Sequence, residues 1–373
     1  MPSRRQVQCR RAGRVNDARM LLPTLQPTVA PPLAVTGPGT HRYAPSGYCA
    51  IALLPLRKTR SDEPMARDRS RDITCCGAFA WAVFGGSGFI GRHLAAQLAT
   101  RGARVRIAVR HADGGSGRPT ETVTADVLDD AAVASAVNGA SAVINLVGIL
   151  GERGRHTYAA VHVEGARRVA LAAKSAGATR LIHLSALGAS RAAPALSDRT
   201  KAEGEEVVRG AFPEATIIRP SLVFGSGDHF FTRWIVMAQR SPMLPLIGKG
   251  ATKFQPAHVE DVAAGITAVL KRSDAVGRTY EFGGPEVYSF KELLELLLAA
   301  VGWQRVLLPV PFPLAEMLAG MLELLPAPPL TRDQVRLLHT NKINSGRDPT
   351  LADLGVRSTE LHAFLGAFKA KYS

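Results

Sequence analysis

Three glycines spaced three residues apart mark the clearest site of chemistry in this sequence. Gly85, Gly88 and Gly91 follow the apolar run 79–84, which predicts a buried strand, and precede an apolar repeat of helical period. In such a pattern the first glycine allows a tight turn, the second lets backbone approach a pyrophosphate, and the third lets the helix pack closely. The helix N-terminus then offers free N–H groups and a positive dipole to phosphate. The segment predicts a dinucleotide-binding loop; the alternative is a glycine-rich turn that only packs tightly.

Polar residues follow the next two predicted strands. Arg110 ends the strand predicted at 105–109. An acid there would bind a ribose 2′-hydroxyl and favour NAD, whereas an arginine can pair with the 2′-phosphate of NADP. We therefore expect NADPH rather than NADH, the alternative being an ordinary surface charge. Asp126 and Val127 follow the third predicted strand, where an adenine would lie.

The elements that position these residues alternate along the chain. After the first, strands are predicted at 105–109, 121–124, 142–147, 180–185 and 215–219, and helices at 90–101, 129–137, 158–176 and 199–209. This alternation predicts the α/β class, with a doubly wound parallel (Rossmann) sheet. Ligands of such sheets bind at the carboxyl ends of the strands, so Leu146, Val147 and Gly148 are expected beside the nucleotide.

We divide the chain into three parts. Residues 1–77 are rich in proline and arginine and show no sustained period, so we expect a disordered basic extension. It can be an organellar transit peptide or a stretch upstream of a true start at Met65. Residues 78–225 are the predicted NADP(H)-binding Rossmann domain. Residues 226–373 are predicted to form a smaller, mainly helical cap or interaction domain, with part of 252–282 returning to the sheet.

The charge is unevenly distributed. The chain has 373 residues and a net charge of +15, but ten of its 46 basic residues and only one of its 31 acidic residues lie within positions 1–60. The remainder is mildly basic, so no nucleic-acid partner is needed to explain the charge. No run approaches the roughly 20 apolar residues of a membrane span.

Cysteine and histidine positions argue against a metal centre. The four cysteines, Cys9, Cys49, Cys75 and Cys76, all precede the glycine loop. This distribution fits a reducing compartment and excludes a disulfide scaffold from the rest of the chain. The histidines have no partners at metal-ligand spacing, and His183, between apolar neighbours in a predicted strand, is interpreted as a core residue. We expect no bound metal.

Several motifs resemble those of the extended and atypical short-chain dehydrogenases/reductases. They are GGSGFIG (85–91), DV (126–127), RP (219–220) with FG (224–225), and PAHVEDV (256–262). A narrower set is similar to the NADPH-holding accessory subunit of respiratory complex I and its bacterial relatives: IHLS (182–185), KAEGE (201–205), RGAFPEA (209–215) and LTRDQV (330–335). The resemblance covers about residues 80–365, and its segments keep the same order over both predicted domains.

This resemblance implies a bound NADPH that is held rather than turned over. It places Arg110 at the 2′-phosphate, Val147 and Gly148 along the nucleotide, Lys201 on the nicotinamide ribose and Pro220 near the nicotinamide. The expected pyrophosphate contacts are Gly85, Ser87, Gly88, Phe89, Ile90 and Gly91. Ser185, at the end of the fifth strand, completes the expected cofactor-binding positions.

The proton-transfer half of the family's machinery is missing. Catalytic members use Tyr-x-x-x-Lys on one helix, in which the lysine grips the ribose and lowers the phenol pKa from ~10. Four residues before Lys201 stands Ser197, and no tyrosine lies between Tyr158 and Tyr280. A serine hydroxyl is shorter than a phenol and far less acidic, so we expect no catalytic residue here. The alternative is that Tyr158 swings in from another helix.

The segment 314–325 carries only two charged residues, Glu316 and Glu323. It can be an interfacial helix that contacts a membrane surface or hydrophobic partner, or an ordinary buried helix. The resemblance favours the interfacial interpretation.

Three functions remain open. The first is an accessory or assembly subunit of a respiratory NADH:quinone oxidoreductase, peripheral to the bacterial inner membrane on its cytoplasmic face or to the mitochondrial inner membrane on its matrix side. The second is an NADPH-dependent reductase or epimerase with an unusual proton donor. The third is a free nucleotide-sensing regulator. The Ser197 substitution separates the second from the others, and co-purification with complex I subunits would separate the first from the third.

Overall fold

The computed structural model describes residues 81–111, 120–326 and 328–372. These residues belong to one compact unit. The predicted disordered extension and the four cysteines lie outside the described residues.

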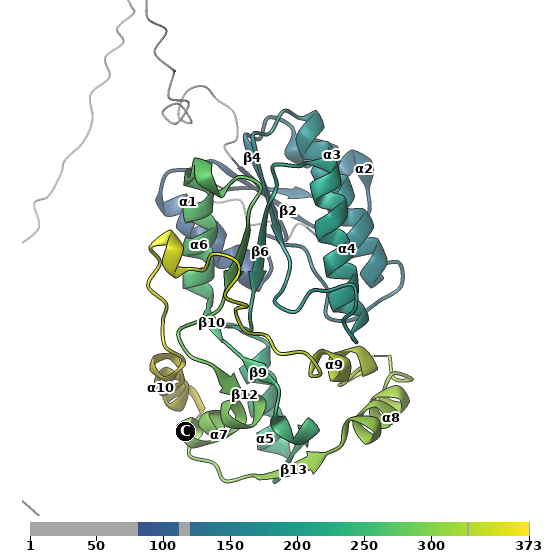
Figure 1. Ribbon diagram of the computed structural model, residues 1–373, viewed down its shortest axis with the longest axis vertical. Coiled ribbons are helices and arrows are strands. Elements are labelled where there is room, and N and C mark those ends of the chain that lie inside the picture. Colours follow the sequence, from purple (N-terminus) through teal and green to yellow (C-terminus); the bar gives the residue numbers. More distant parts are fainter. Residues whose placement is uncertain (1–80, 112–119, 327, 373) are drawn as a thin grey trace, which may run out of the picture. The chain divides into compact units, whose positions relative to one another are not determined.

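A seven-stranded parallel sheet forms the centre of the described chain, in the order β3-β2-β1-β4-β5-β6-β11 (Figure 1). Its strands are β1 (Trp81–Phe84), β2 (Val105–Val109), β3 (Thr120–Thr124), β4 (Ala142–Asn145), β5 (Arg180–Leu184), β6 (Thr216–Pro220) and β11 (Thr279–Phe282). The chain leaves β1 for β2 and β3 on one side, then returns past β1 to continue through β4. The predicted doubly wound sheet is thereby confirmed, and the carboxyl ends of β1 and β4 lie together at the switch in direction.

Helices cover both faces of the sheet (Figure 1). On one face α1 (Phe89–Thr100) packs against α6 (Val259–Lys271). On the other lie α2 (Asp130–Val137), the π-helix η1 (Ala159–Gly165), α3 (Ala166–Ser175) and α4 (Leu196–Ala211). Successive β1 side chains point to opposite layers: Val83 packs with α1 and α6, while Ala82 and Phe84 pack with the other group. Helices thus cover both faces of the sheet, as is expected for buried parallel strands.

Residues 257–282 extend this Rossmann architecture. The short strand β10 (Ala257–His258) pairs with β7 (Val223–Phe224) and leads into α6. β11 then pairs in parallel with β6 and forms the edge of the large sheet. The short 3₁₀ turn Ser273–Ala275 connects α6 to β11.

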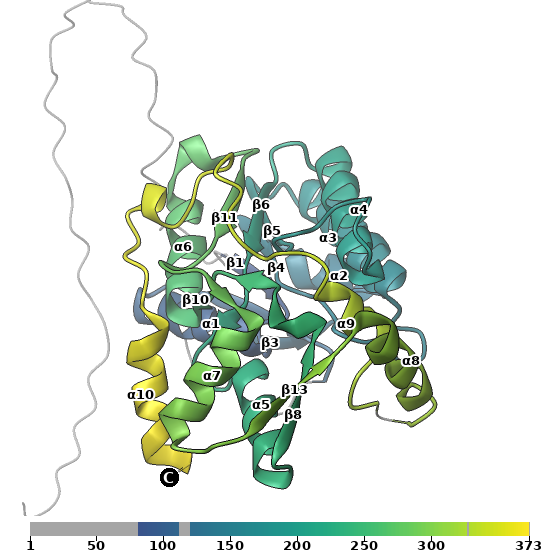
Figure 2. The same ribbon diagram turned by 60° about the horizontal axis from the view of Figure 1, so that its bottom comes forward.

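The rest of the C-terminal part is mainly helical, as predicted. Its helices are α5 (Phe230–Arg240), α7 (Phe290–Val301), α8 (Phe312–Leu322), α9 (Arg332–Leu337) and α10 (Leu361–Tyr372). Two small ribbons accompany them, β8 (Met243–Ile247) with β13 (Val306–Val310) and β9 (Lys253–Phe254) with β12 (Tyr288–Ser289), and so do 3₁₀ turns at Gly248–Gly250 and Ala352–Leu354. Figure 2 shows α10 beside α7 and α9 beside α8. Phe231, Phe290 and Leu294 lie at the centre of a separate aromatic-rich core.

Candidate nucleotide-binding site

The glycine loop between β1 and α1 brings backbone segments unusually close. Gly85 has a φ of +75°, in the left-handed region that favours glycine. A Cβ on Gly91 would lie 2.2 Å from the Gly85 carbonyl oxygen and 2.5 Å from the Gly86 Cα. Gly88 is the N-cap of α1, and no side chain of the described chain caps that helix. The loop therefore has room for a phosphate at an uncapped helix N-terminus.

A groove of about 180 Å³ opens beside this loop at the carboxyl ends of the strands. Nine of the predicted positions line it: Gly85, Ser87, Gly88, Arg110, Asp126, Val127, Leu146, Val147 and Gly148. Phe89, Ile90 and Gly91 form the first turn of α1 next to the loop. Sequence reasoning missed six further lining residues: Ala108, Val109, Ala125, Ile149, His156 and Val161. Val109, Ala125 and Ile149 are direct neighbours of predicted positions, a spacing that could have indicated them.

Two charged residues in the groove differ in their partners. The exposed Arg110 guanidinium makes no ion pair or hydrogen bond within the described ranges and is free to meet an anion. The Asp126 carboxylate is held 2.6 Å from Arg155 Nη2 and 3.0 Å from His156 Nε2. Partial burial opposes ionisation of Asp126, but the Leu128 amide, His156 and Arg155 together lower its pKa. Asp126 is therefore a fixed anion that can accept hydrogen bonds but cannot donate them.

Ser185, Pro220 and Lys201 lie outside the lining of this groove. Ser185 follows β5 and Pro220 ends β6, so both are at the same carboxyl edge of the sheet. The Ser185 amide donates to the Ile218 carbonyl oxygen at 2.7 Å, while its hydroxyl is buried and has no hydrogen-bond partner in the described chain. Lys201 is half-buried on α4. An unpartnered buried hydroxyl at this edge fits contact with a bound molecule.

A buried histidine joins the groove wall to α4. His162 Nε2 accepts a hydrogen bond from the Ile149 amide at 3.1 Å, so the ring proton lies on Nδ1, 3.0 Å from the Thr200 hydroxyl. Burial, together with the nearby charge of Lys201, lowers the pKa of His162 to about 3, which keeps the ring neutral. His162 lies within the π-helix, and its side chain is buried. Sequence reasoning found no metal-ligand spacing among the histidines and did not anticipate these contacts of His162.

Comparison with known proteins supports the same assignment. The sequence matches the NAD dependent epimerase/dehydratase family over residues 81–283, more than half of the chain. The chain belongs to this family. It is 34% identical over 310 residues to NADH dehydrogenase [ubiquinone] 1 alpha subcomplex subunit 9, mitochondrial, of Arabidopsis thaliana, covering 78% of this chain and 77% of the relative. The predicted resemblance to the complex I accessory subunit is thereby confirmed.

Two other similarities are informative. A ceramide reductase of Caulobacter vibrioides is 36% identical over 195 residues, covering 51% of this chain and 60% of the relative. A dTDP-glucose 4,6-dehydratase from Streptomyces venezuelae, solved with NAD, superposes with a TM-score of 0.59 at 19% identity, over 79% of this chain and 96% of that structure. The structural likeness supports the fold, and membership of an NAD-dependent family supports a nicotinamide nucleotide cofactor.

The position of the family's catalytic tyrosine holds a buried serine. Ser197 lies in the first turn of α4, four residues before Lys201, and its hydroxyl has no hydrogen-bond partner in the described part of the chain. Burial lowers the pKa of Lys201, although the Asp198 carboxylate raises it. A serine hydroxyl beside this lysine has neither the reach nor the acidity of a phenol.

Tyr158 does not replace that tyrosine. Its side chain is buried beside His162, with ring centroids 5.5 Å apart. Burial raises the pKa of Tyr158, and the carboxylates of Asp333 and Glu152 raise it further. A catalytic tyrosine in this family needs a neighbouring cation that lowers the phenol pKa, so the surroundings of Tyr158 act in the opposite direction.

A larger cavity lies elsewhere and shares no residue with the groove. It measures about 730 Å³ and lies between α7 and β13, with Leu246, Leu298 and Leu307 among its lining residues. Size alone would favour it, but it has no glycine loop, and none of its lining residues belongs to a strand of the large sheet. Over the described ranges, no cluster of three potential metal ligands occurs, and no helix is both long and apolar enough to cross a membrane.

Proposed function

We propose that this chain is an accessory or assembly subunit of a respiratory NADH:quinone oxidoreductase that holds NADPH as a structural cofactor. One observation carries the proposal: nine of the positions expected to bind the nucleotide line a single groove, whereas Ser197 occupies the position of the proton donor. The similarity to complex I subunits over most of the chain supports the same function.

The free Arg110 guanidinium supports NADPH over NADH, because a 2′-phosphate would give this side chain a bidentate anionic partner. Ser87, Gly88 and the first turn of α1 would hold the pyrophosphate, with Asp126 and Val127 beside the adenine. Lys201 would contact the nicotinamide ribose, and Pro220 would lie near the nicotinamide. A bound NADPH would supply a hydride donor, but the chain's own residues bind and orient it without a placed proton source.

The apolar helix α8 supports docking onto a large partner or membrane surface through residues 314–325. Its buried residues are the small Ala315 and Ala319. Its exposed large residues are Leu314, Met317, Leu318 and Met321, and Leu324 and Leu325 directly after the helix are also exposed. The four residues within the helix follow the spacing of one helical face, so the apolar stripe points outward. The partner would be the matrix arm of the mitochondrial complex, or its cytoplasmic counterpart in a bacterium.

Mass spectrometry of the nucleotide released by denaturing the purified protein tests this function. NADPH at about one molecule per chain, retained through purification, would support a structural cofactor. An empty protein that binds NADPH weakly and exchangeably would overturn the structural role. Co-purification with complex I subunits is the second requirement, and recovery of the chain entirely free of them would favour a nucleotide-sensing regulator.

An NADPH-dependent reductase is the second candidate, favoured by the similarity to a ceramide reductase over half of the chain. This function requires an exchangeable NADPH and its stoichiometric oxidation when a carbonyl substrate is added. Retention of reduced NADPH in the presence of excess long-chain keto substrate would exclude this candidate for that substrate class.

A further inference from the structure

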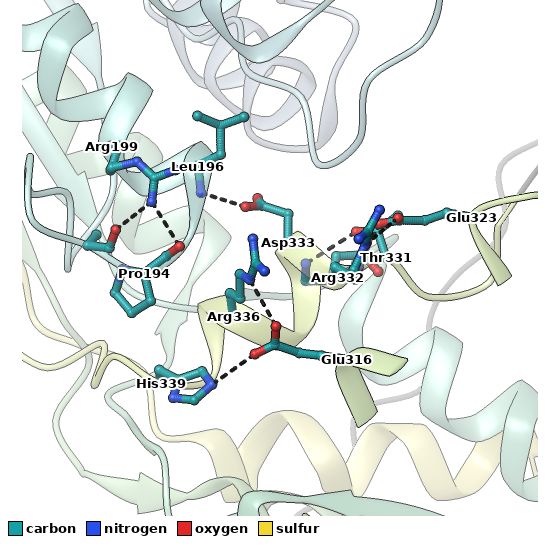
Figure 3. A network of polar contacts seen from close by, with 12 residues as sticks. Pro194, Leu196, Arg199, Glu316, Glu323, Thr331, Arg332, Asp333, Arg336 and His339 are labelled. Atoms are coloured by element: carbon teal, nitrogen blue, oxygen red, sulfur yellow. Dashed lines mark hydrogen bonds and ion pairs between the residues drawn. The ribbon is translucent and has the colours of Figure 1, made fainter. Parts of the chain in front are cut away.

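The N-terminus of α4 is capped by a residue far away in the sequence. Its own N-cap residue, Ala195, has no side chain that can accept a hydrogen bond. Instead, Asp333 of α9 accepts from the Leu196 amide at 2.5 Å through Oδ1 and from the Ser197 amide at 3.2 Å through Oδ2 (Figure 3). One carboxylate thus satisfies two of the free amides and places negative charge at the positive end of the helix dipole.

Asp333 is itself held firmly in place. Its helix is capped by Thr331, whose hydroxyl accepts from the Gln334 amide at 3.2 Å, and anchored by the buried Val335. Two ion pairs join α9 to the segment that carries α8, Arg332 with Glu323 at 2.8 Å and Arg336 with Glu316 at 3.1 Å (Figure 3). The position of Asp333 is therefore set by the C-terminal part rather than by α4.

The first turn of α4 leads directly to Lys201. Ser197, whose amide Asp333 binds, precedes Lys201 by about one helical turn, so a shift of the first turn moves the lysine with it. The following turns are fixed independently, because a Cβ on Gly204 would lie 2.2 Å from the His162 carbonyl oxygen. The capping contact therefore acts on the segment between the helix start and this close contact, which includes Lys201.

We propose that Asp333 is a positioning residue for the cofactor: by capping α4 from the C-terminal part, it fixes Lys201 against the nicotinamide ribose. This inference rests on the function proposed above. Its consequence is that α9 determines how tightly the nicotinamide half of the nucleotide is held, while the glycine loop holds the adenine and phosphate half. The two halves of one ligand are thereby controlled by separate parts of the chain.

The test compares two ligands on the full-length chain freed of nucleotide. Affinities for NADPH and for 2′,5′-ADP, which lacks the nicotinamide and its ribose, are measured by calorimetry for wild type, Asp333→Ala and Lys201→Ala. Loss of one cap should weaken NADPH binding by roughly tenfold, with 2′,5′-ADP affinity within twofold of wild type. Equal weakening of both ligands would show a merely structural role and overturn the proposal.

A double variant and two matched substitutions complete the design. In the Lys201→Ala background, Asp333→Ala should cause no further loss of NADPH affinity; an additional tenfold loss would overturn the proposal. Asp333→Asn keeps one acceptor oxygen and should restore part of the affinity, and it replaces Asp333→Ala if that variant fails to fold. Glu323→Gln breaks an ion pair of the same region without contacting α4 and should change NADPH affinity less than Asp333→Ala.

The outcomes for the wild type separate the two proposals. If it binds neither ligand, the proposed function and this inference both fail. If it binds both ligands and Asp333→Ala leaves NADPH affinity unchanged, only the inference fails.

Discussion

The glycine loop and the α8–α9 region use their small residues in opposite ways. In the loop, Gly85 and Gly91 bring backbone to backbone, so that the main chain itself forms the binding surface. In α8, Ala315 and Ala319 face the interior, and large side chains such as Met321, 64% exposed, point outward. The loop is built to meet a small anion through amides, and the helix to meet an apolar surface through side chains.

This contrast shows which features depend on neighbouring residues and which depend on distant ones. The loop is complete within the seven residues 85–91 and one adjacent strand end. The α8–α9 region reaches the same site through Asp333, which bonds the start of α4 across 137 residues of sequence. Substitutions in the loop should therefore lower stability and nucleotide binding together. Substitutions on the exposed face of α8 should change docking while leaving the fold and the nucleotide site intact.

The largest effect is expected for Gly91→Ala. Its Cβ would overlap the Gly85 carbonyl oxygen at 2.2 Å, so the loop must move. We expect the free energy of unfolding to fall by about 3 kcal/mol, as in other overpacked sites, with loss of nucleotide binding. Urea unfolding measures the change. Gly210→Ala is the matched control, because Gly210 is also helical and a Cβ there meets nothing within 4 Å. That variant should be stabilised by up to roughly 1 kcal/mol, and equal behaviour of the two would refute the steric argument.

Acid should destabilise the cofactor-facing core through two neutral histidines. Burial lowers the pKa of His162 to about 3 and that of His183 to about 4. Both ionise near 6.5 in the unfolded chain, so the unfolded state binds more protons below that pH and the free energy of unfolding falls as the pH decreases. Between pH 7 and 5.5 the two together should contribute a loss of roughly 2 to 3 kcal/mol.

The variant His162→Gln isolates one of these histidines. The loss measured by urea unfolding between pH 7 and 5.5 should shrink by about half of the predicted amount in this variant. An unchanged pH dependence would mean that His162 is not kept neutral by the fold.

The sheet and the glycine loop were predictable because their signals are local. Most of the strands are short apolar runs, and residues such as Arg110 and Val147 follow from the rule that ligands bind at the carboxyl ends of parallel strands. Nine predicted positions accordingly line one groove. The cofactor contacts assigned to Ser185, Lys201 and Pro220 stay predictions, since they came from the family resemblance.

Other features depend on contacts that no local pattern encodes. The helix expected over 158–176 begins with the π-helix Ala159–Gly165, where His162 bonds both Ile149 and Thr200. The pairing of Asp126 with Arg155 and His156 closes a loop of about thirty residues, and the capping of α4 by Asp333 closes a much larger one. The scarcity of charge in 314–325 also indicated an apolar segment, but it could not show that the large side chains of this segment point outward.

Removal of the Arg110 charge tests whether this side chain, outside the glycine loop, recognises the 2′-phosphate. Arg110→Ala should weaken NADPH binding by about 10- to 100-fold through loss of a charge-assisted contact, with NADH affinity nearly unchanged. Calorimetric titration with both nucleotides measures the ratio. Arg153→Ala, which removes an exposed positive charge outside the groove lining, is the control for net charge. A parallel loss of affinity for NADH would show that Arg110 does not recognise the 2′-phosphate.

The smallest effect on stability is expected on the exposed face of α8. Met317 and Met321 are 59% and 64% exposed, so the double change to aspartate should alter the free energy of unfolding by only about 1 kcal/mol in total. The same change should abolish co-sedimentation with membranes that contain the respiratory complex, because two charges would enter an apolar interface.

Ala319→Asp is the opposite control: a charge at this fully buried position should lower the free energy of unfolding by several kcal/mol, roughly the cost of an unpaired buried charge. Persistence of co-sedimentation in the double aspartate variant would exclude α8 as the docking surface and leave its outward-facing apolar stripe without a partner. The proposal for the nucleotide site would be unaffected, because that site is built from other residues.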